Sequence, residues 1–489
     1  MGQEVMSTRK AVAALAVLVL SAVGVHGDDW VQWGGTPERN MVNLVEKNIP
    51  AEWDIETGKN IAWKARLGSQ TYGNPTISNG KIFIGTNNQA ERQPKATGDK
   101  GVIMCFSEKD GKFLWQLTHD KLAAGRVNDW PRQGICSSPA VDGDRIYYVS
   151  NRCELVCADT EGFLDGENDG PFKDETLTDR IDGDIVWSFD MMYELGVFPH
   201  NLATCSVTYD DKHIYLVSGN GVDEGHIVLP DPFAPSFLAF DKKTGELVWE
   251  AANPGEKVLH GQWSNPALGT IGGVRQAVFP GGDGVVYSFE PETGELLWSF
   301  QCNPANSVWR LGGLGTRNNI IATPVIHGDH VFVSVGQDPE HGEGDGHMYA
   351  IDGTKRGDIT NTGAIWHSEE VQRAMSTPAV HDGIVYMCDL AGFFRAMDAE
   401  TGETIWEHDV IAAVWSSPYL VDGKVFLGDE DGDVIVFKAG REKEVLFETN
   451  MGNSVYTTPV AANGVLYVTN RMTLFAIAPG AKSDPDEVQ

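Results

Sequence analysis

The sequence predicts an all-β fold, an eight-bladed β-propeller of four-stranded antiparallel blades closed by an N-terminal strand. Three observations predict it. Short runs rich in Val, Ile, Tyr and Phe are separated by Asp-Gly and Thr-Gly turns, a pattern typical of antiparallel hairpins. One sequence motif of this kind recurs eight times, and a single copy cannot bury both faces of its own sheet. The last copy lacks a fourth strand, and a matching strand lies near the N-terminus.

The clearest copy of the motif spans residues 376–406. It divides into four expected strands at 376–380, 384–388, 393–397 and 403–406. A His-Asp-Gly turn separates the first two strands, and a turn ending in Thr-Gly separates the last two. Strands of four to six residues split by such turns indicate one antiparallel blade.

The other copies keep the same opening and closing residues. The opening is a Ser, Thr or Asn followed by proline, at Pro75, Pro139, Pro266, Pro324, Pro378, Pro418 and Pro459, and the copy at Ser206 lacks the proline. The closing is a glycine turn followed by tryptophan, at Trp115, Trp187, Trp249, Trp298, Trp366 and Trp406. The seventh copy replaces this tryptophan with Leu446-Phe447. We expect these positions to be equivalent in every blade.

The two ends of the chain are expected to complete one blade together. The eighth copy, residues 457–477, has three strands, and residues 56–63 end in Gly58…Trp63 like a fourth strand. Closing the ring in this way removes the open sheet edges that promote aggregation. We therefore divide the chain into a signal peptide (1–27), a leader (28–55), the propeller (56–480) and an acidic tail (481–489).

The N-terminal segment is typical of a secretory signal peptide. Arg9 and Lys10 precede an apolar run, residues 11–25, and small residues precede Asp28. The run is shorter than the ~20 residues of a membrane-spanning helix, although an uncleaved anchor is the alternative. We expect an exported bacterial protein, periplasmic or extracellular, without an integral membrane span after cleavage. In the leader, Trp30 and Trp33 either cap one end of the ring or pack on its surface.

Composition excludes some partners. The chain has 69 acidic and 37 basic residues and a net charge of −32, which excludes nucleic-acid backbones and disfavours anionic membranes. The charge favours solubility and a monomer, or alternatively a cationic partner. Seven cysteines are an odd number, so at least one is unpaired within the chain. A bridge within the second and third blades and buried free thiols remain as alternatives.

The repeated motif resembles the pyrroloquinoline-quinone (PQQ) repeat. The residues that carry the resemblance are Tyr349-Ala350-Ile351-Asp352 and Ala396-Met397-Asp398, followed by the Thr-Gly turn and tryptophan. The resemblance covers residues 56–477 and implies a girdle in which the tryptophan and turn glycine dock each blade on its neighbour. This family includes quinoprotein dehydrogenases and non-catalytic scaffolds such as the outer-membrane assembly lipoprotein. The fold therefore leaves activity open.

Long loops are expected on one face of the ring, which we call the top face. It carries the loops between second and third strands and the connections between blades, and such loops commonly bind ligands. Aromatic and polar residues there suit a planar anion such as PQQ, because rings stack on the plane and arginines bind carboxylates. The candidate cofactor-binding residues are Arg132, His200, Asn201, Trp263, Arg317, Asn318, Trp415 and Tyr456, with His260 and Arg373 beside them. The alternative is a channel plugged by bulky side chains with a wet polar rim.

Two segments are candidates for metal binding. Asp165, Glu167 and Asp169 precede Gly170 and resemble the start of a Ca²⁺ loop, but position twelve is Thr176, so a solvated acidic loop is the alternative. Residues 338–347 place Asp338, Glu340, His341 and His347 in one glycine-rich segment, which is compatible with a divalent transition metal.

Two functions follow from these observations. The first is a non-catalytic binding or scaffold module whose top face binds a protein, peptide or polysaccharide. The alternative is a PQQ- and Ca²⁺-dependent dehydrogenase that oxidises an alcohol or sugar. The chain has no Cys-x-x-Cys-His haem motif and no adjacent cysteine pair, so it resembles neither the methanol nor the alcohol dehydrogenase branch. It also has no Gly-x-Ser-x-Gly elbow for a nucleophilic serine, and no catalytic residue is assigned.

Overall fold

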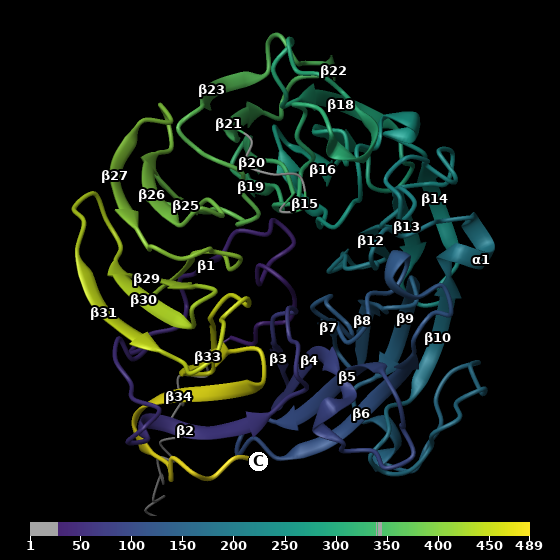
Figure 1. Ribbon diagram of the computed structural model, residues 1–489, viewed down its shortest axis with the longest axis vertical. Coiled ribbons are helices and arrows are strands. Elements are labelled where there is room, and N and C mark those ends of the chain that lie inside the picture. The colour runs from purple at the N-terminus through teal and green to yellow at the C-terminus, as the bar shows by residue number, and fades with distance from the viewer. Residues whose placement is uncertain (1–27, 339, 341–344) are drawn as a thin grey trace, which may run out of the picture.

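The computed structural model describes residues 28–338, 340 and 345–489, and they form a ring of eight β-sheets (Figure 1). The predicted eight-bladed propeller is thus confirmed. The predicted signal peptide, residues 1–27, lies outside the described residues. No helix in the described part of the chain has the length and apolarity needed to cross a membrane.

The blades follow one another along the chain. Blades 1 and 2 hold β3 (Thr76–Ser78), β4 (Lys81–Asn87), β5 (Lys100–Ser107) and β6 (Phe113–Asp120), then β7 (Ala140–Asp142), β8 (Arg145–Val149), β9 (Glu154–Asp159) and β10 (Ile185–Asp190). Blades 3 and 4 hold β11 (Thr208–Tyr209), β12 (His213–Val217), β13 (Phe237–Asp241) and β14 (Leu247–Ala251), then β15 (Ala267–Ile271), β16 (Val274–Pro280), β17 (Val285–Phe289), β18 (Leu296–Gln301) and the added β22 (Gly357–Asp358).

The second half of the ring repeats this order. Blades 5 and 6 hold β19 (Val325–His327), β20 (His330–Val335), β21 (His347–Asp352) and β23 (Ala364–Ser368), then β24 (Ala379–His381), β25 (Ile384–Cys388), β26 (Phe393–Asp398) and β27 (Thr404–Asp409). Blades 7 and 8 hold β28 (Tyr419–Val421), β29 (Lys424–Gly428), β30 (Asp433–Lys438), β31 (Val445–Asn450) and the added β1 (Val42–Asn43), then β32 (Val460–Ala462), β33 (Val465–Thr469), β34 (Thr473–Lys482) and β2 (Lys59–Arg66).

Helical segments are short and lie between strands. They are α1 (Met191–Leu195) and the 3₁₀ turns η1 (Asn88–Ala90), η2 (Gly125–Val127), η3 (Gly162–Leu164), η4 (Gly255–Lys257) and η5 (Leu311–Gly313). All except η3 fall in loops of the top face or next to them, so the irregular structure is concentrated where ligand-binding loops were expected.

The N-terminal strand closes the ring, as predicted. β2 pairs antiparallel with β34, from Lys59 opposite Lys482 to Arg66 opposite Thr473. β34 extends to Lys482. The remaining residues fold back beside β2, where the Gln489 backbone N–H donates to Lys64 and its carbonyl accepts from the Arg66 N–H.

A closed ring of hydrogen bonds explains the Ser, Thr or Asn before each proline. In each blade the backbone N–H of this residue donates to the side chain of the equivalent residue in the next blade. The one exception is Asn265, whose side-chain amide donates to the Thr323 hydroxyl. The members are Asn74, Ser138, Ser206, Asn265, Thr323, Thr377, Ser417 and Thr458, and the last donates back to Asn74. The proline that follows needs no hydrogen-bond partner for its nitrogen, so the motif joins blades without leaving a buried donor unpaired.

The tryptophan girdle docks neighbouring blades on one another. The indole N–H of Trp63 donates to the Glu108 carbonyl at 3.1 Å, and that of Trp366 donates to the Ala399 carbonyl at 2.9 Å, each in the following blade. The turn glycine of the following blade lies against the indole ring of this tryptophan. The girdle expected from the PQQ-repeat resemblance is present, and Trp298 departs from it by bonding Gln276 within its own blade.

We expect Gly402→Ala to test the girdle. Gly402 has φ +74° and a Cβ there would lie 2.5 Å from Cε3 of Trp366, so alanine adds a clash to the cost of a left-handed backbone. The free energy of unfolding should fall by about 2–4 kcal/mol. Gly383→Ala is the matched control, because Gly383 has φ +72° and nothing within 4 Å of a Cβ. It should lose only about 1 kcal/mol in the same urea titration. Equal losses would contradict the packing role of Gly402.

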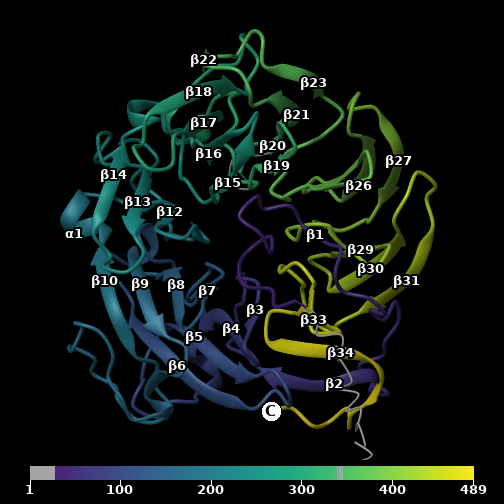
Figure 2. The same cartoon turned by 180° about the vertical axis from the view of Figure 1, so that it is seen from behind.

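The leader caps the ring by running around the inner strands of all eight blades (Figure 2). Residues from Trp30 to Asn43 hydrogen-bond in turn with one inner-strand residue of each blade. These partners are Ile77, Val141, Thr208, Leu268, Ile326, Val380, Leu420 and Ala461. Of the two alternatives for the leader, the structure therefore shows the cap and not simple surface packing.

The cysteines are free thiols. All seven are unpaired and six of them are buried, as small apolar residues commonly are. A disulfide in blades 2 and 3 is thus absent from the structure.

Candidate functional site

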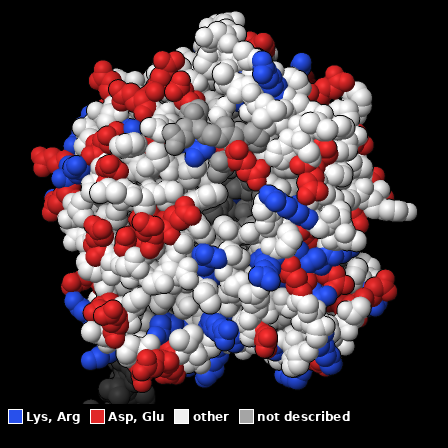
Figure 3. Space-filling model, viewed as in Figure 1, with Lys and Arg blue, Asp and Glu red and all other residues white. Residues whose placement is uncertain are grey.

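The top face carries most of the long loops, although the longest one, residues 160–184 between β9 and β10, lies on the opposite face. The top face is hollowed at its centre (Figure 3). Acidic side chains gather in several groups around its rim, and basic side chains lie between them. The eight residues predicted to bind a cofactor all belong to loops of this face, but they come from different blades. They fall into separate places around the ring.

Four of these residues bond to the loops around them, three of them to a neighbouring loop and one within its own loop. The Arg132 backbone N–H donates to Asp99, and the Asn201 N–H donates to the Val127 carbonyl. Arg317 Nε donates to the Ser307 hydroxyl at 3.1 Å, and Asn318 Nδ2 donates to the Asp345 carbonyl at 3.0 Å. These contacts order the loops. None of them places an arginine on the aromatic ring of a residue predicted to bind the cofactor.

His200 and Trp263 meet in a cluster of histidines between blades 3, 4 and 5. His200 precedes β11, His226 lies between β12 and β13, and His260 precedes β15. The ring centroids of His200 and His260 are 4.2 Å apart, and those of His226 and His260 are 4.4 Å apart. With Glu340 from the loop after β20, one ligand atom from each residue lies within 4.8 Å of the others. We call these four residues the histidine cluster.

Hydrogen bonds orient the buried rings of the histidine cluster. His200 Nδ1 donates to the Val222 carbonyl at 2.8 Å, and His260 Nδ1 donates to Asp338 Oδ2 at 2.9 Å. Burial, and then the neighbouring His260, lowers the pKa of His200 to about 3, so its imidazole is neutral at pH 7. The Nε2 atom of this ring is buried without a hydrogen-bond partner among the described residues.

Aromatic rings from the loops before β28, β32 and β3 lie close together on the top face. Tyr72 and Tyr456 stack with centroids 5.0 Å apart, and Trp415 meets Tyr456 edge-on at 5.7 Å. Glu430 accepts from the Trp415 indole and from the Tyr456 hydroxyl, at 3.2 Å each. Two predicted site residues, Trp415 and Tyr456, are therefore brought together by a carboxylate.

A groove between blades 6 and 7 shares Trp415 and Glu430 with this group of rings. We call it the blade 6–7 groove, and it encloses a volume of about 580 Å³. Its lining residues are Gln372, Arg373, Leu390, Ala391, Phe393, Asp409, Ile411, Ala412, Ala413, Trp415 and Glu430. The lining is mainly apolar with a few polar groups, as expected for a ligand site.

The predicted Ca²⁺ loop lies at the outer side of blade 2. The Asp169 carboxylate pairs with Arg145 Nη2 at 3.1 Å, and Asp165 accepts from the Glu167 backbone N–H at 2.9 Å. Among the described residues, two groups of side chains have the spacing of metal ligands, and Asp165, Glu167 and Asp169 belong to neither. Calcium binding in this loop stays a prediction, with Arg145 as a competing cation.

The second predicted metal segment is divided by the structure. Residues 341–344 lie outside the described residues, so His341 is not placed. Glu340 joins the histidine cluster, whereas His347 forms a second group with His367 and Glu369. The segment thus contributes to two separate groups, which its spacing did not indicate.

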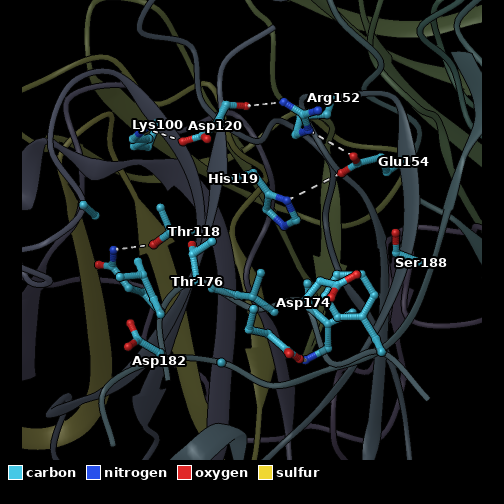
Figure 4. A pocket seen from close by; sticks show the side chains of 18 of the residues that line it. Lys100, Thr118, His119, Asp120, Arg152, Glu154, Asp174, Thr176, Asp182 and Ser188 are labelled. Atoms are coloured by element: carbon cyan, nitrogen blue, oxygen red, sulfur yellow. Dashed lines mark hydrogen bonds and ion pairs between the residues drawn. The ribbon is translucent and has the colours of Figure 1, made fainter. Parts of the chain in front are cut away.

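A further cavity of about 360 Å³ lies at the outer side of blades 1 and 2 (Figure 4). Its charged groups pair with one another: Lys100 with Asp120, and Arg152 Nε with Glu154 Oε1 at 3.0 Å. His119 is buried, which lowers its pKa to about 3, and bonds the Tyr148 hydroxyl at 2.7 Å. These mutual pairs suit a structural polar cluster, so the top face remains the candidate site.

Comparison with known proteins identifies the family. The model described as outer membrane protein assembly factor BamB, built on PQQ repeats, matches residues 174–389 and 391–482. The chain belongs to the PQQ-repeat propeller family. A protein from Pseudomonas sp named polyvinylalcohol dehydrogenase is 24% identical over 394 residues, which are 74% of this chain and 51% of that protein. BamB of Yersinia pestis is 21% identical over 295 residues, 59% of this chain and 65% of that one.

Both kinds of family member share the fold. The match spans about half of the first relative and less than two thirds of the second. The structure of BamB from Moraxella catarrhalis covers 87% of this chain with a TM-score of 0.53, and 98% of that chain is matched at 13% identity. The structure of a europium-containing methanol dehydrogenase covers 91% of this chain with a TM-score of 0.60, and 90% of that chain is matched at 13% identity. These likenesses show the PQQ-repeat fold and leave the activity open.

The PQQ-repeat fold alone does not make a quinone site. In the blade 6–7 groove, Trp415 and Arg373 are a ring and a cation of the expected kinds. The Glu430 carboxylate, however, bonds both Trp415 and Tyr456 and would repel a tricarboxylate lying on these rings. The residues present therefore fit PQQ poorly, and we derive no chemical step through it.

Proposed function

We propose that this protein is an exported, non-catalytic binding module that holds an extended polypeptide segment in the blade 6–7 groove. The observation that carries the proposal is the groove itself. Its lining includes exposed Ile411 and the aromatic ring of Trp415. A tryptophan in a pocket is the residue type that most often dominates peptide and protein binding.

The backbone at the groove supports a binding role. Ile411 has φ +64° and is 86% exposed. A β-branched residue in the left-handed region is strained, and exposing an isoleucine gains no burial. The Ile411 N–H donates to Asp409 Oδ1 at 2.9 Å, which holds the turn with this side chain facing solvent. A partner that covers Ile411 would recover the hydrophobic contribution.

The chemistry of the groove favours a peptide over a polysaccharide. Leu390, Phe393 and Ile411 supply apolar surface, while Arg373 and Glu430 are charges of opposite sign. Such a surface suits alternating apolar side chains of an extended chain. Relatives named outer membrane protein assembly factors support a polypeptide partner. Export is supported by the predicted signal peptide.

The alternative is a PQQ- and Ca²⁺-dependent dehydrogenase. It is supported by the relationship to a polyvinylalcohol dehydrogenase. The carboxylate of Glu430 beside the aromatic rings argues against it, so the binding module is the preferred function.

We expect Trp415→Ala to weaken peptide binding by at least about 30-fold, since a tryptophan anchor contributes about 2 kcal/mol or more. The probe is an array of 15-residue peptides that alternate apolar and polar residues, with shuffled all-polar peptides for comparison. Leu296→Ala is the matched control, because Leu296 is an exposed apolar residue on the outer strand of blade 4. Affinities are measured by fluorescence anisotropy.

The same samples are titrated with PQQ at millimolar Ca²⁺. Peptide binding that weakens in Trp415→Ala and not in Leu296→Ala supports the proposal. Binding of no peptide, or equal losses in both variants, overturns it. A saturating rise of the melting temperature with PQQ, together with dye-linked alcohol oxidation, would replace it with the dehydrogenase.

A further inference from the structure

We propose that His200, His226, His260 and Glu340 bind a divalent first-row transition metal of the zinc type on the top face. This inference goes beyond the proposed function, because the histidine cluster belongs to blades 3–5 and the peptide groove to blades 6 and 7. It rests on the geometry of four side chains from four different loops.

The distances fit a metal centre. His226 Nε2 and His260 Nε2 are 3.3 Å apart. Two nitrogens at about 2.0–2.1 Å from a tetrahedral zinc ion are about 3.3–3.4 Å from each other. Glu340 Oε2 lies 3.9 Å from His226 Nε2 and 3.8 Å from His260 Nε2, so a small movement of an exposed side chain completes the set.

The second ring nitrogens are arranged as in known metal sites. His200 Nδ1 donates to a backbone carbonyl and His260 Nδ1 donates to Asp338, which leaves the Nε2 lone pairs of both rings directed away from these partners. Metal-bound histidines characteristically donate their other N–H to a carbonyl or carboxylate in this way. The buried Nε2 of His200 has no hydrogen-bond partner in the described chain, and a metal ion would supply one.

Glycines allow the loops to approach closely enough. A Cβ on Gly221 would lie 2.7 Å from Cβ of His200 and 2.6 Å from the His260 carbonyl oxygen. A Cβ on Gly312 would lie 2.6 Å from the His226 carbonyl oxygen. Any larger residue at these two positions would push the histidine loops apart, so the close approach is built into the sequence.

The ligand set selects the class of metal. Three imidazoles and one carboxylate suit zinc, iron, nickel or copper, whereas Ca²⁺ and Mg²⁺ prefer oxygen ligands. His200 and His260 are buried, while the side chains of His226 and Glu340 are 25% and 38% exposed. The site is thus open on one side, which leaves a bound metal accessible to a ligand from solvent.

The test uses the full chain stripped of metal with a chelator and then dialysed. Zn²⁺ binding is measured by calorimetry, and Co²⁺ binding by its visible absorption, which reports nitrogen ligands and coordination geometry. The variants are His226→Asn and Glu340→Gln at half-exposed ligands, Asp338→Asn at the positioning residue, and His367→Asn in the second group as the matched control. Circular dichroism of the metal-free proteins checks that each variant is folded.

We expect one Zn²⁺ per chain at the histidine cluster, weakened at least about 100-fold in His226→Asn and about 10–100-fold in Asp338→Asn. The Co²⁺ spectrum should change in Glu340→Gln and stay unchanged in His367→Asn. Unaltered affinity in both His226→Asn and Glu340→Gln would overturn the proposal, and so would a loss confined to His367→Asn. If His226→Asn does not fold, the spectrum of Glu340→Gln decides.

Discussion

Deleting residues 28–64 is expected to leave a chain that aggregates and shows no cooperative unfolding. The deletion removes the leader and most of β2, the outer strand of blade 8. Without β2, the paired edge of β34 from Thr473 to Lys482 is exposed, and an exposed edge strand recruits other chains. The measurement is size-exclusion chromatography with light scattering, followed by thermal unfolding of the soluble fraction.

The leader adds a second loss to the open edge. It hydrogen-bonds to the inner strand of every blade, so its removal leaves eight acceptors or donors unpaired at the centre of the ring. A polar group that stays buried without a partner costs about 1–3 kcal/mol, so even a few such groups consume a large part of a domain's stability.

A rearranged chain separates the two contributions. Lys59 pairs with Lys482, so residues 59–66 can follow Lys482 through a two-residue turn as a hairpin. Joined to the deleted chain, this strand restores blade 8 without the leader. We expect partial recovery of soluble monomer and a melting temperature below that of the full chain. A deleted chain that is already monomeric and fully stable would show that the ring closes without β2.

The architecture could be predicted because it is periodic. Eight copies with a common opening and closing fix the blades, and the copy that lacks one strand identifies 56–63 as its complement. The Ser, Thr or Asn before each proline was visible as a motif, but its hydrogen-bond ring was not, because the partner in the next blade along the chain is 40 to 68 residues away. The path of the leader has no periodicity of its own, so only the structure reveals it.

The histidine cluster shows why a site is harder to predict than a fold. His200 was a candidate for cofactor binding, and Glu340 belonged to a segment with metal-like spacing. His226 carried no local signal, since nothing near it in the sequence repeats or pairs with it. The four ligands lie in four loops that differ in length from blade to blade, and such contacts leave no pattern along the chain.

Arg39→Met is expected to lower the free energy of unfolding by about 3–5 kcal/mol. Arg39 is fully buried in the leader and donates to three carbonyls: Nε to Pro266 at 2.8 Å, Nη1 to Trp33 at 2.7 Å and Nη2 to Ser206 at 2.7 Å. Burial lowers the pKa of its guanidinium to about 10, so it remains charged at neutral pH. Methionine fills much of the same space but leaves the three carbonyls without donors, and lysine would reach only one or two of them.

The loss of stability should be specific to the buried guanidinium of Arg39. Arg441→Ala is the matched control, because Arg441 pairs with Asp398 at 2.8 Å on the surface with 59% of its side chain exposed. An exposed pair contributes about 0–1 kcal/mol, so the control should stay close to wild type in urea. Arg39→Lys should fall between the two. Because Arg39 joins the leader to blades 3 and 4, its loss should also expose the leader to limited proteolysis before the blades are cleaved. A loss below 1 kcal/mol in Arg39→Met would mean that the leader is held by its other backbone pairs alone.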